Sequence, residues 1–257
     1  LQSGHTYYVI KVDETHIKLA ASVADATAET ATAINLTSAG SGTGHRLFET
    51  THSLTTSAVA GAGAPNVGVA GAVAINIAGS RTEAYLESGS STDAGSGDVT
   101  LKAENTVVSG ASAKAKNTAT AKTGIGAGIA VNITPITTRA EIEDSAVLTG
   151  GDDLSITATT TPTITTAAEA GAAGTSTSVG GGIAVSYSDV TTTAGVGESG
   201  TPLNLTGALT VKAYELDGKT STTVDATVAG SDVAVGAAIA VNVGSNEAFA
   251  ATERVIV

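Results

Sequence analysis

The sequence contains no cysteine, methionine or tryptophan, and only 3% of its 257 residues are aromatic. The absence of cysteine excludes disulfides, thiolate zinc sites and cysteine nucleophiles. With so few aromatic residues, a rounded hydrophobic core would be hard to fill, although the 42% apolar content favours a folded chain. We therefore expect a thin core extended along an axis, in which each unit buries its apolar face against its neighbours.

Basic residues and long apolar runs are also scarce. Twelve Lys and Arg residues face 24 Asp and Glu residues, which gives a net charge of −12, and the basic residues form no tract. This balance disfavours binding to nucleic acid and to anionic membrane surfaces. No uninterrupted apolar run is long enough to cross a membrane as a helix, so we expect no transmembrane segment.

What the chain does contain is a repeated phrase. The sequence VAGAVAINI at residues 69–77 returns as IGAGIAVNI at 125–133, VGGGIAVSY at 179–187 and VGAAIAVNV at 235–243. Successive copies begin 56, 54 and 56 residues apart. A spacing of this size indicates that whole supersecondary units have been repeated, rather than one isolated strand.

Each copy alternates strictly between two kinds of residue. In the second copy Ile125, Ile129 and Val131 point one way, while Gly126 and Gly128 point the other. A period of two predicts a strand, and a nearly bare Gly and Ala face can lie very close to another sheet. Branched residues at matching positions would stack as aliphatic ladders. A polar position near the end of each copy predicts an interior or corner amide ladder of Asn76, Asn132, Ser186 and Asn242. A row of side chains presented to a ligand is the alternative.

Further phrases recur in register with the first. DVTLKA at 98–103, DLSITA at 153–158 and ALTVKA at 208–213 lie 55 residues apart and have the pattern of a strand with one solvated side. Alanine stripes and short Glu-containing segments complete each unit. Gly, Thr and Ser crowd the alanine stripes and no capping box precedes them, so we reject a helical interpretation. One unit is expected to hold about four strands.

The first part of the chain differs from the array. Two alternating segments, 6–13 and 16–20, predict a hairpin, and 22–32 is compatible with one short helix. A further strand around 46–48 is possible. We therefore divide the chain into a small β-rich module, 1–53, and a β-repeat array, 54–257, with four copies of which the last is incomplete. We expect another subunit or further chain to continue the stack past Val257.

Four of these segments carry a resemblance. TYYVIKVDETHIKLA at 6–20 with LTSAG at 36–40 resembles a short module of very large secreted bacterial repeat proteins. GDVTLKA at 97–103 and GIAVN at 128–132 resemble the β-solenoid repeats of the same giant adhesin-like proteins. The resemblance covers nearly the whole chain. It implies a cell-surface or extracellular role in adhesion, matrix or fibre formation, and it brings no catalytic residue with it.

Direct evidence of chemistry is sparse. The four histidines form no zinc motif, and the GIGAG sequence at 124–128 sits inside a strand pattern with no helix behind it, so a phosphate loop is not predicted. Carboxylates near Gly-rich turns can bind calcium, although the Gly-Gly-x-Gly-x-Asp repeat of calcium β-rolls is absent. The weak calcium candidates are Glu141, Glu143, Asp144, Asp152 and Asp153, with a solvated acidic edge as the alternative.

The sequence thus predicts an all-β protein: a β-solenoid or elongated stacked-sheet array of about 55-residue repeats, preceded by a small β-rich module. The expected function is a structural or adhesive extracellular segment, not an enzyme and without a required cofactor. Its expected partners are further copies at the array ends, and surface glycans or host cells. The alternative is a carbohydrate-active β-helix lyase or glycosidase. That alternative requires carboxylates in a groove lined by aromatic or basic residues, which are scarce here.

Overall fold

The computed structural model describes residues 7–12, 17–28, 30–34, 52–230 and 232–257. The chain divides into two compact units, Leu1–Phe48 and Glu49–Val257. The described residues are almost entirely strands, so the prediction of an all-β protein is confirmed. No helix among them is long and apolar enough to cross a membrane.

The described residues of the first unit form an antiparallel pair and one short helix. Strands β1 (Tyr8–Lys11) and β2 (Ile17–Ala20) pair with Tyr8 opposite Ala20, as expected of the predicted hairpin. Helix α1 (Val23–Thr27) begins after Ser22, whose side chain accepts a hydrogen bond from the Asp25 backbone N–H at 3.1 Å. The strand expected around 46–48 lies outside the described residues.

The second unit contains every other strand. Its strands in chain order are β3 (His52–Ala62), β4 (Val67–Ile77), β5 (Ser80–Leu86), β6 (Ser91–Gly95), β7 (Val99–Ile142), β8 (Val147–Gly150), β9 (Leu154–Val196), β10 (Leu209–Glu215), β11 (Lys219–Asp225), β12 (Val228–Ala229) and β13 (Val233–Thr252). All pairings within this unit are parallel.

The pairing register follows the spacing of the sequence phrases. Ala74 lies beside Ala130, Ala130 beside Ala184, and Ala184 beside Ala240. The chain therefore advances by one strand position for every passage of about 55 residues, and we call each passage a coil. Because equivalent residues pair, identical side chains form rows across neighbouring coils.

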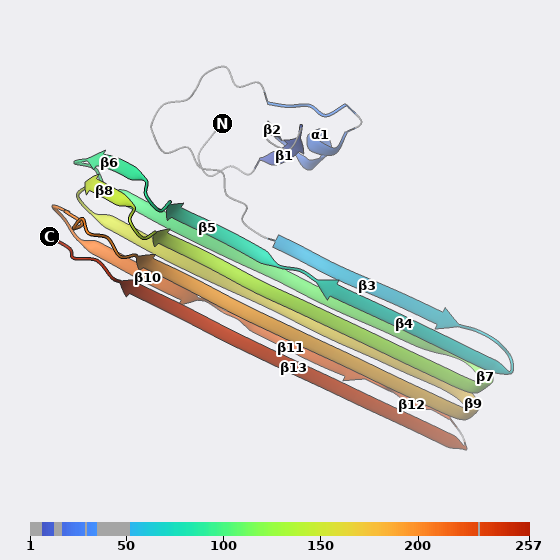
Figure 1. Cartoon of the computed structure of the whole chain (residues 1–257). Coiled ribbons are helices and arrows are strands. Elements are labelled where there is room, and N and C mark those ends of the chain that lie inside the picture. Colours follow the sequence, from blue (N-terminus) through green and yellow to red (C-terminus); the bar gives the residue numbers. More distant parts are fainter. Residues whose placement is uncertain (1–6, 13–16, 29, 35–51, 231) are drawn as a thin grey trace. The chain divides into compact units, whose positions relative to one another are not determined.

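Each coil consists of an out arm and a return arm (Figure 1). The out arms are residues 52–62, 99–117, 154–173 and 209–229, and the return arms are 67–86, 121–142, 177–196 and 233–252. The two sets of arms form two sheet layers. Side-chain contacts between the two layers show that the chain reverses direction within each coil. Ser109 of an out arm lies 2.9 Å from Asn132 of the return arm, and in the next coil Thr160 lies 2.6 Å from Thr192. We call the reversal end the tip and the opposite end, which carries β6 and β8, the base.

The two layers approach each other very closely near the tip. A β-carbon placed on Gly126 would lie 2.5 Å from the Gly171 carbonyl oxygen, and one on Gly128 would lie 2.7 Å from that of Glu169. Sheets in ordinary sandwiches lie about 10 Å apart because side chains fill the gap. Here the bare Gly and Ala face makes the short separation possible, as the sequence pattern suggested.

Side-chain size in the core changes from base to tip. Near the base the buried residues include Ile142, Leu148, Leu154 and Ile156. A smaller cluster follows, made of Val107, Ile136, Ile164 and Val190. The cluster nearer the tip consists of buried alanines: Ala70, Ala72, Ala74, Ala111, Ala113, Ala115, Ala130, Ala168 and Ala184. The layers therefore converge toward the tip because the side chains between them become smaller.

Two sequence-based expectations require correction. The predicted strands of one unit run together, since β7 alone spans 44 residues across the reversal. The expectation that each unit buries its apolar face is wrong for the return arms, where the Gly and Ala face is inside and the branched face is outside. Val73, Ile75 and Ile77 are 57%, 54% and 71% exposed, whereas Ala74 is 1% exposed. The inner gap is too narrow for branched side chains.

Candidate functional site

Two of the five calcium candidates lie around an arginine. Arg139, on the outer face of the β7 return arm, contacts Glu83 at 2.9 Å, Glu141 at 3.0 Å and Glu143 at 2.7 Å. Its guanidinium also lies 4.8 Å from the centre of the Tyr85 ring. The carboxylates of Glu141 and Glu143 are thus already paired with a protein cation that links two coils.

The pKa values of this cluster follow its geometry. Hydrogen bonding from Arg81 and Arg139 holds the pKa of Glu83 below its ordinary value. The pKa of Glu143 is lowered first by the Ser88 backbone N–H, at 2.9 Å, and then by Arg139. Burial acts to lower the pKa of Arg139, but its hydrogen bonds to the three glutamates raise the pKa overall. The lowered pKa values keep Glu83 and Glu143 charged at neutral pH, whereas a general acid needs a raised pKa.

The other three candidates accept hydrogen bonds from the next coil. Asp144 accepts from the Glu198 backbone N–H at 2.8 Å, and Asp153 accepts from the Ala208 N–H at 2.7 Å. Asp152 accepts from the Thr206 hydroxyl at 2.9 Å. These carboxylates join the connecting segments at the base from one coil to the next. Among the residues the structure describes, no group of three or more His, Asp or Glu side chains is arranged to hold a metal, and calcium binding stays a prediction.

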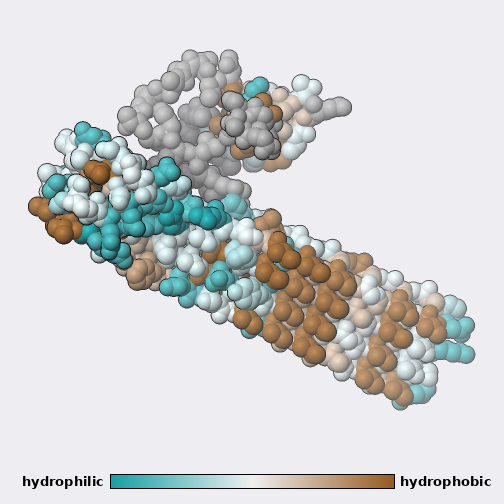
Figure 2. Space-filling view, viewed as in Figure 1, coloured by the Kyte–Doolittle hydropathy of each residue, from teal (hydrophilic) through white to brown (hydrophobic). Residues whose placement is uncertain are grey.

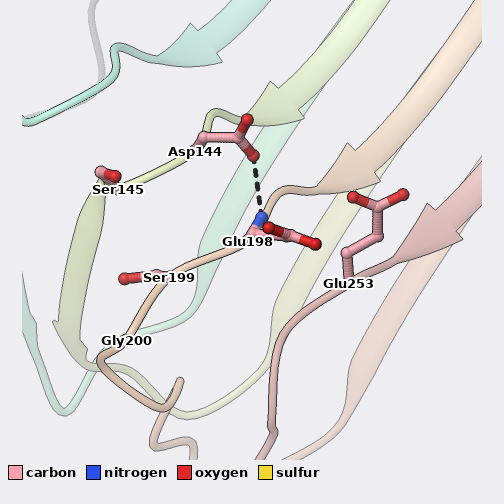
Figure 3. A pocket seen from close by; sticks show the side chains of 6 residues that line it. All are labelled: Asp144, Ser145, Glu198, Ser199, Gly200 and Glu253. Atoms are coloured by element: carbon pink, nitrogen blue, oxygen red, sulfur yellow. Dashed lines mark hydrogen bonds between the residues drawn. The ribbon is translucent and has the colours of Figure 1, made fainter.

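A polar hollow lies at the base beside Asp144 (Figure 3). Its volume is about 500 Å³, and it is lined by Asp144, Ser145, Glu198, Ser199, Gly200 and Glu253. The three carboxylates come from three successive coils, and neither an aromatic nor a basic side chain lines the hollow. A polysaccharide-cleaving site needs such side chains to hold the sugar ring, so the hollow lacks the groove chemistry expected of the enzyme alternative.

The predicted amide ladder is hydrogen-bonded in the first two coils. Asn76 Nδ2 donates to Asn132 Oδ1 at 3.1 Å, and Asn132 Oδ1 also accepts from Ser109 and Thr134 at 2.9 and 3.1 Å. In the third coil the Ser186 hydroxyl is buried without a hydrogen-bond partner. The fourth member, Asn242, is exposed. The first two coils therefore contain a polar layer between the sheets, not a row of side chains offered to a ligand.

The sequence patterns gave no indication of a buried arginine at the base. Arg254 is 7% exposed and donates to the carbonyl oxygens of Gly197 at 3.0 Å, Ala146 at 2.7 Å and Glu143 at 3.4 Å. Burial lowers the pKa of its guanidinium. This side chain satisfies carbonyls of the second and third coils at once, which makes it a structural clamp. Its partners lie 57 to 111 residues earlier, so no local pattern could reveal it.

The tip-side part of the outer face of the return arms is chemically uniform. Brown hydrophobic side chains gather there in bands across neighbouring coils (Figure 2). These side chains belong to the four copies of the repeated phrase, at 69–77, 125–133, 179–187 and 235–243. Twelve of them are more than one third exposed: Val69, Val73, Ile75, Ile77, Ile129, Val179, Ile183, Val235, Ile239, Val241, Val243 and the aromatic Tyr187. A contiguous apolar surface of this kind marks an interaction site.

Comparison with known protein families, curated proteins and solved structures gives no match to this chain.

Proposed function

We propose that the chain is a β-solenoid repeat segment with a structural or adhesive extracellular role, which extends into a fibre or cell-surface stalk by stacking of β-units. The parallel register between coils supports the solenoid. Strand β9 pairs with β7 on one side and with the fourth coil on the other, over nearly all of its 43 residues. Contacts between adjacent coils account for almost all pairing, as in quasi-one-dimensional repeat proteins.

The observation that carries the stacking proposal is the exposure of β13. This strand is 20 residues long and pairs only with β9 among the described residues. Its inward position Ala240 is exposed, whereas Ala184, the equivalent residue of the preceding coil, is completely buried. A long flat strand edge with free backbone groups is a template for another strand. A further coil or another subunit added in parallel register would cover both the edge and the inner residues.

The adhesive and extracellular part of the proposal rests on the resemblance to giant secreted repeat proteins, with surface glycans or host cells as binding partners. The chemistry of the array is compatible with it. The conspicuous groups are an ion-paired cluster around Arg139, hydrogen-bonded aspartates and a hollow without aromatic or basic lining. An acidic surface with these features favours a scaffold over a catalyst.

Stacking can be tested by blocking the edge of β13. The variant Ala240→Lys places a charge in the inward position of this strand, a device by which natural edge strands prevent association. Thr165→Lys is the matched control, because Thr165 is exposed on the outer face of the out arms, away from the edge. We expect the unaltered chain and the control to form rods that lengthen with protein concentration in electron micrographs, and Ala240→Lys to form no rods.

Unaltered chains that form no rods at any concentration would contradict stacking. Adhesion is tested separately by retention of the chain on immobilised neutral and acidic polysaccharides. Release of sugar from those polysaccharides would instead favour the enzyme alternative.

A further inference from the structure

The aliphatic face is a flat apolar surface with a regular relief. We define it as the outward residues of 69–77, 125–133, 179–187 and 235–243, which form five rows across the four coils. Four rows carry branched or aromatic side chains. The second row consists of Gly71, Ala127, Gly181 and Ala237, and a β-carbon placed on Gly71 or Gly181 would meet no atom within 4 Å. The second row is therefore a trough, with one ridge of side chains on its tip side and three ridges on its base side. In Figure 2 the ridges appear as brown bands and the trough as a pale band between them.

Such a face is unusual for a parallel sheet exposed to water. Sheets with only parallel strands are nearly always covered on both faces, and their strands are accordingly apolar on both sides. In this array the inner side of the return arms is covered by the out arms, and the outer side is bare. Val73, Ile183 and Ile239 are 57%, 37% and 54% exposed. The return arms thus have the residue pattern of a sheet buried on both faces, but a single chain covers only their inner face.

We propose that the aliphatic face binds the aliphatic face of a second copy of this chain, face to face about a twofold axis. This lateral contact goes beyond the proposed stacking, which joins strand edges and leaves the face bare. A second copy fits the charge distribution. The chain carries a net charge of −12, so two copies repel each other over most of their surface, but no outward position of the five rows is Asp, Glu, Lys, Arg or His. An uncharged face is where like-charged copies can meet.

The area of the face is sufficient for a specific dimer. Five rows at about 6.7 Å and four coils at about 4.8 Å give a face of about 34 by 19 Å, or about 640 Å². Pairing two such faces would bury about 1,300 Å², which lies in the range of about 1,200–2,000 Å² typical of stable interfaces. The contact is isologous, so every residue is used by both copies.

The relief of the face selects one register. A twofold axis that runs along the central row, which contains Ile129 and Ile183, sets the trough of each copy against the partner's fourth row. That row carries Ile75, Val131, Val185 and Val241, so branched side chains enter the space that Gly71 and Gly181 leave open. The outer rows then face each other over their full length. The same axis places the two acidic base ends at opposite ends of the dimer, where they repel least.

The first test is self-association of the full chain by sedimentation velocity. The variant Ile129→Lys buries an unpaired charge on both copies near the axis, and we expect its dissociation constant to rise at least about 100-fold. Ile239→Lys, at a position 54% exposed, provides a second variant that does not strain the fold. The matched control is Val59→Lys, because Val59 is 75% exposed on the outer face of the out arms. The three variants and the chain without these substitutions are all compared in the Ala240→Lys background, so that end-on stacking does not contribute.

The second test uses the absence of cysteine from the chain. In the proposed register two copies of residue 129 lie near the axis, whereas two copies of residue 235 lie about 30 Å apart. A bismaleimide with a spacer of about 10 Å should therefore join Ile129→Cys chains in pairs and leave Val235→Cys chains single.

Several results would overturn lateral pairing: a monomer at all concentrations in the edge-blocked background, equal effects of Ile129→Lys and Val59→Lys, or coupling of Val235→Cys in preference to Ile129→Cys. Flotation of monomeric chain with phosphatidylcholine vesicles, lost in Ile129→Lys, would also overturn it by assigning the face to lipid. Failure of rod formation in the unaltered chain would instead count against the stacking proposal alone.

Discussion

At the scale of single residues, the close approach of the two sheets depends on glycine. Gly126 faces inward, where an added β-carbon would lie 2.5 Å from the backbone oxygen of Gly171, a group that cannot move aside. Gly181 faces outward, where the same carbon would meet nothing within 4 Å. Identical substitutions at these two positions therefore probe opposite sides of the same sheet.

We expect Gly126→Ala to lower the free energy of unfolding by about 1–3 kcal/mol, as overpacking does, because the layers must separate locally. Gly181→Ala should leave it unchanged or raise it slightly, since the added methyl restricts the unfolded chain and meets open space. Urea unfolding followed by circular dichroism measures both. Equal losses in the two variants would show that the close approach is not what selects glycine.

The carboxylates that bind arginine and lysine make stability depend on pH. The pKa values of Glu83 and Glu143 are lowered by hydrogen bonds, and that of Glu169 is lowered by its hydrogen bond with Lys114. A carboxyl group with a lowered pKa in the folded state stabilises the fold above its ordinary value of 4.5, and this contribution is lost as the pH falls through the lowered value. We therefore expect the melting temperature to decrease when the pH is lowered below about 4.5.

The variant Glu83→Gln isolates this contribution. It removes one titrating carboxyl group while keeping the size of the side chain, so the difference in melting temperature from the unaltered chain should be largest at pH 7 and shrink toward pH 3. A difference that is constant across this range would contradict the role of the charge.

At the scale of elements, the strands are joined by a polar layer inside an otherwise apolar core. Asn132 is completely buried in β7, and its side-chain oxygen accepts from Asn76 in the preceding coil and from Ser109 in the facing layer. It thus connects neighbouring strands within a sheet and also connects the two sheets. If one strand shifted by one residue along its neighbour, these buried donors would lose their acceptor. The polar layer therefore helps to fix the strand register.

We expect Asn132→Ala to lower the free energy of unfolding by about 1–3 kcal/mol, because it leaves buried donors without a partner. In the edge-blocked Ala240→Lys background, Asn242→Ala, at the same position of the fourth coil, should change it by less than about 0.5 kcal/mol since that side chain is exposed. Thermal and urea unfolding of both variants gives the comparison. A larger loss at Asn242 would indicate that the fourth coil is covered in solution.

At the scale of the whole molecule, the array is a linear series of coils in which each coil contacts its neighbours. Val99 and Leu154 occupy equivalent positions in the second and third coils. Removing residues 99–153 therefore joins Asp98 to Leu154 and deletes one complete coil without changing the register of the rest. Linear repeat proteins tolerate this change because their stability is a sum over units and interfaces.

We expect the shortened array to fold, with a denaturant m-value lower by about a quarter because one of four coils no longer contributes surface. Deletion of residues 99–125 is the control: it removes about half a coil and sets an out arm against a return arm. This control should lose the strand signal in circular dichroism. A folded control would show that register between equivalent residues is not required.

The sequence by itself determined the all-β fold, the positions of the repeats and the rows they form. These follow from local alternation with a period of two and from the spacing of phrases such as 125–133 and 179–187, both of which depend only on which residues are near each other in the chain. The polar layer at Asn76 and Asn132 was also predictable, because identical residues at one repeat position must lie side by side.

Only the tertiary structure decided which face of the return arms is buried. Alternation separates Gly126 from Ile125 but does not say which side faces inward; the out arm decides it, because its backbone leaves no room for a branched side chain. The same holds for Arg139, which pairs with two calcium candidates, and for Arg254, whose carbonyl partners lie in earlier coils. Packing between residues far apart in the sequence placed these groups. The same packing exposed the branched side chains of the return arms, which the composition had suggested would form a thin core.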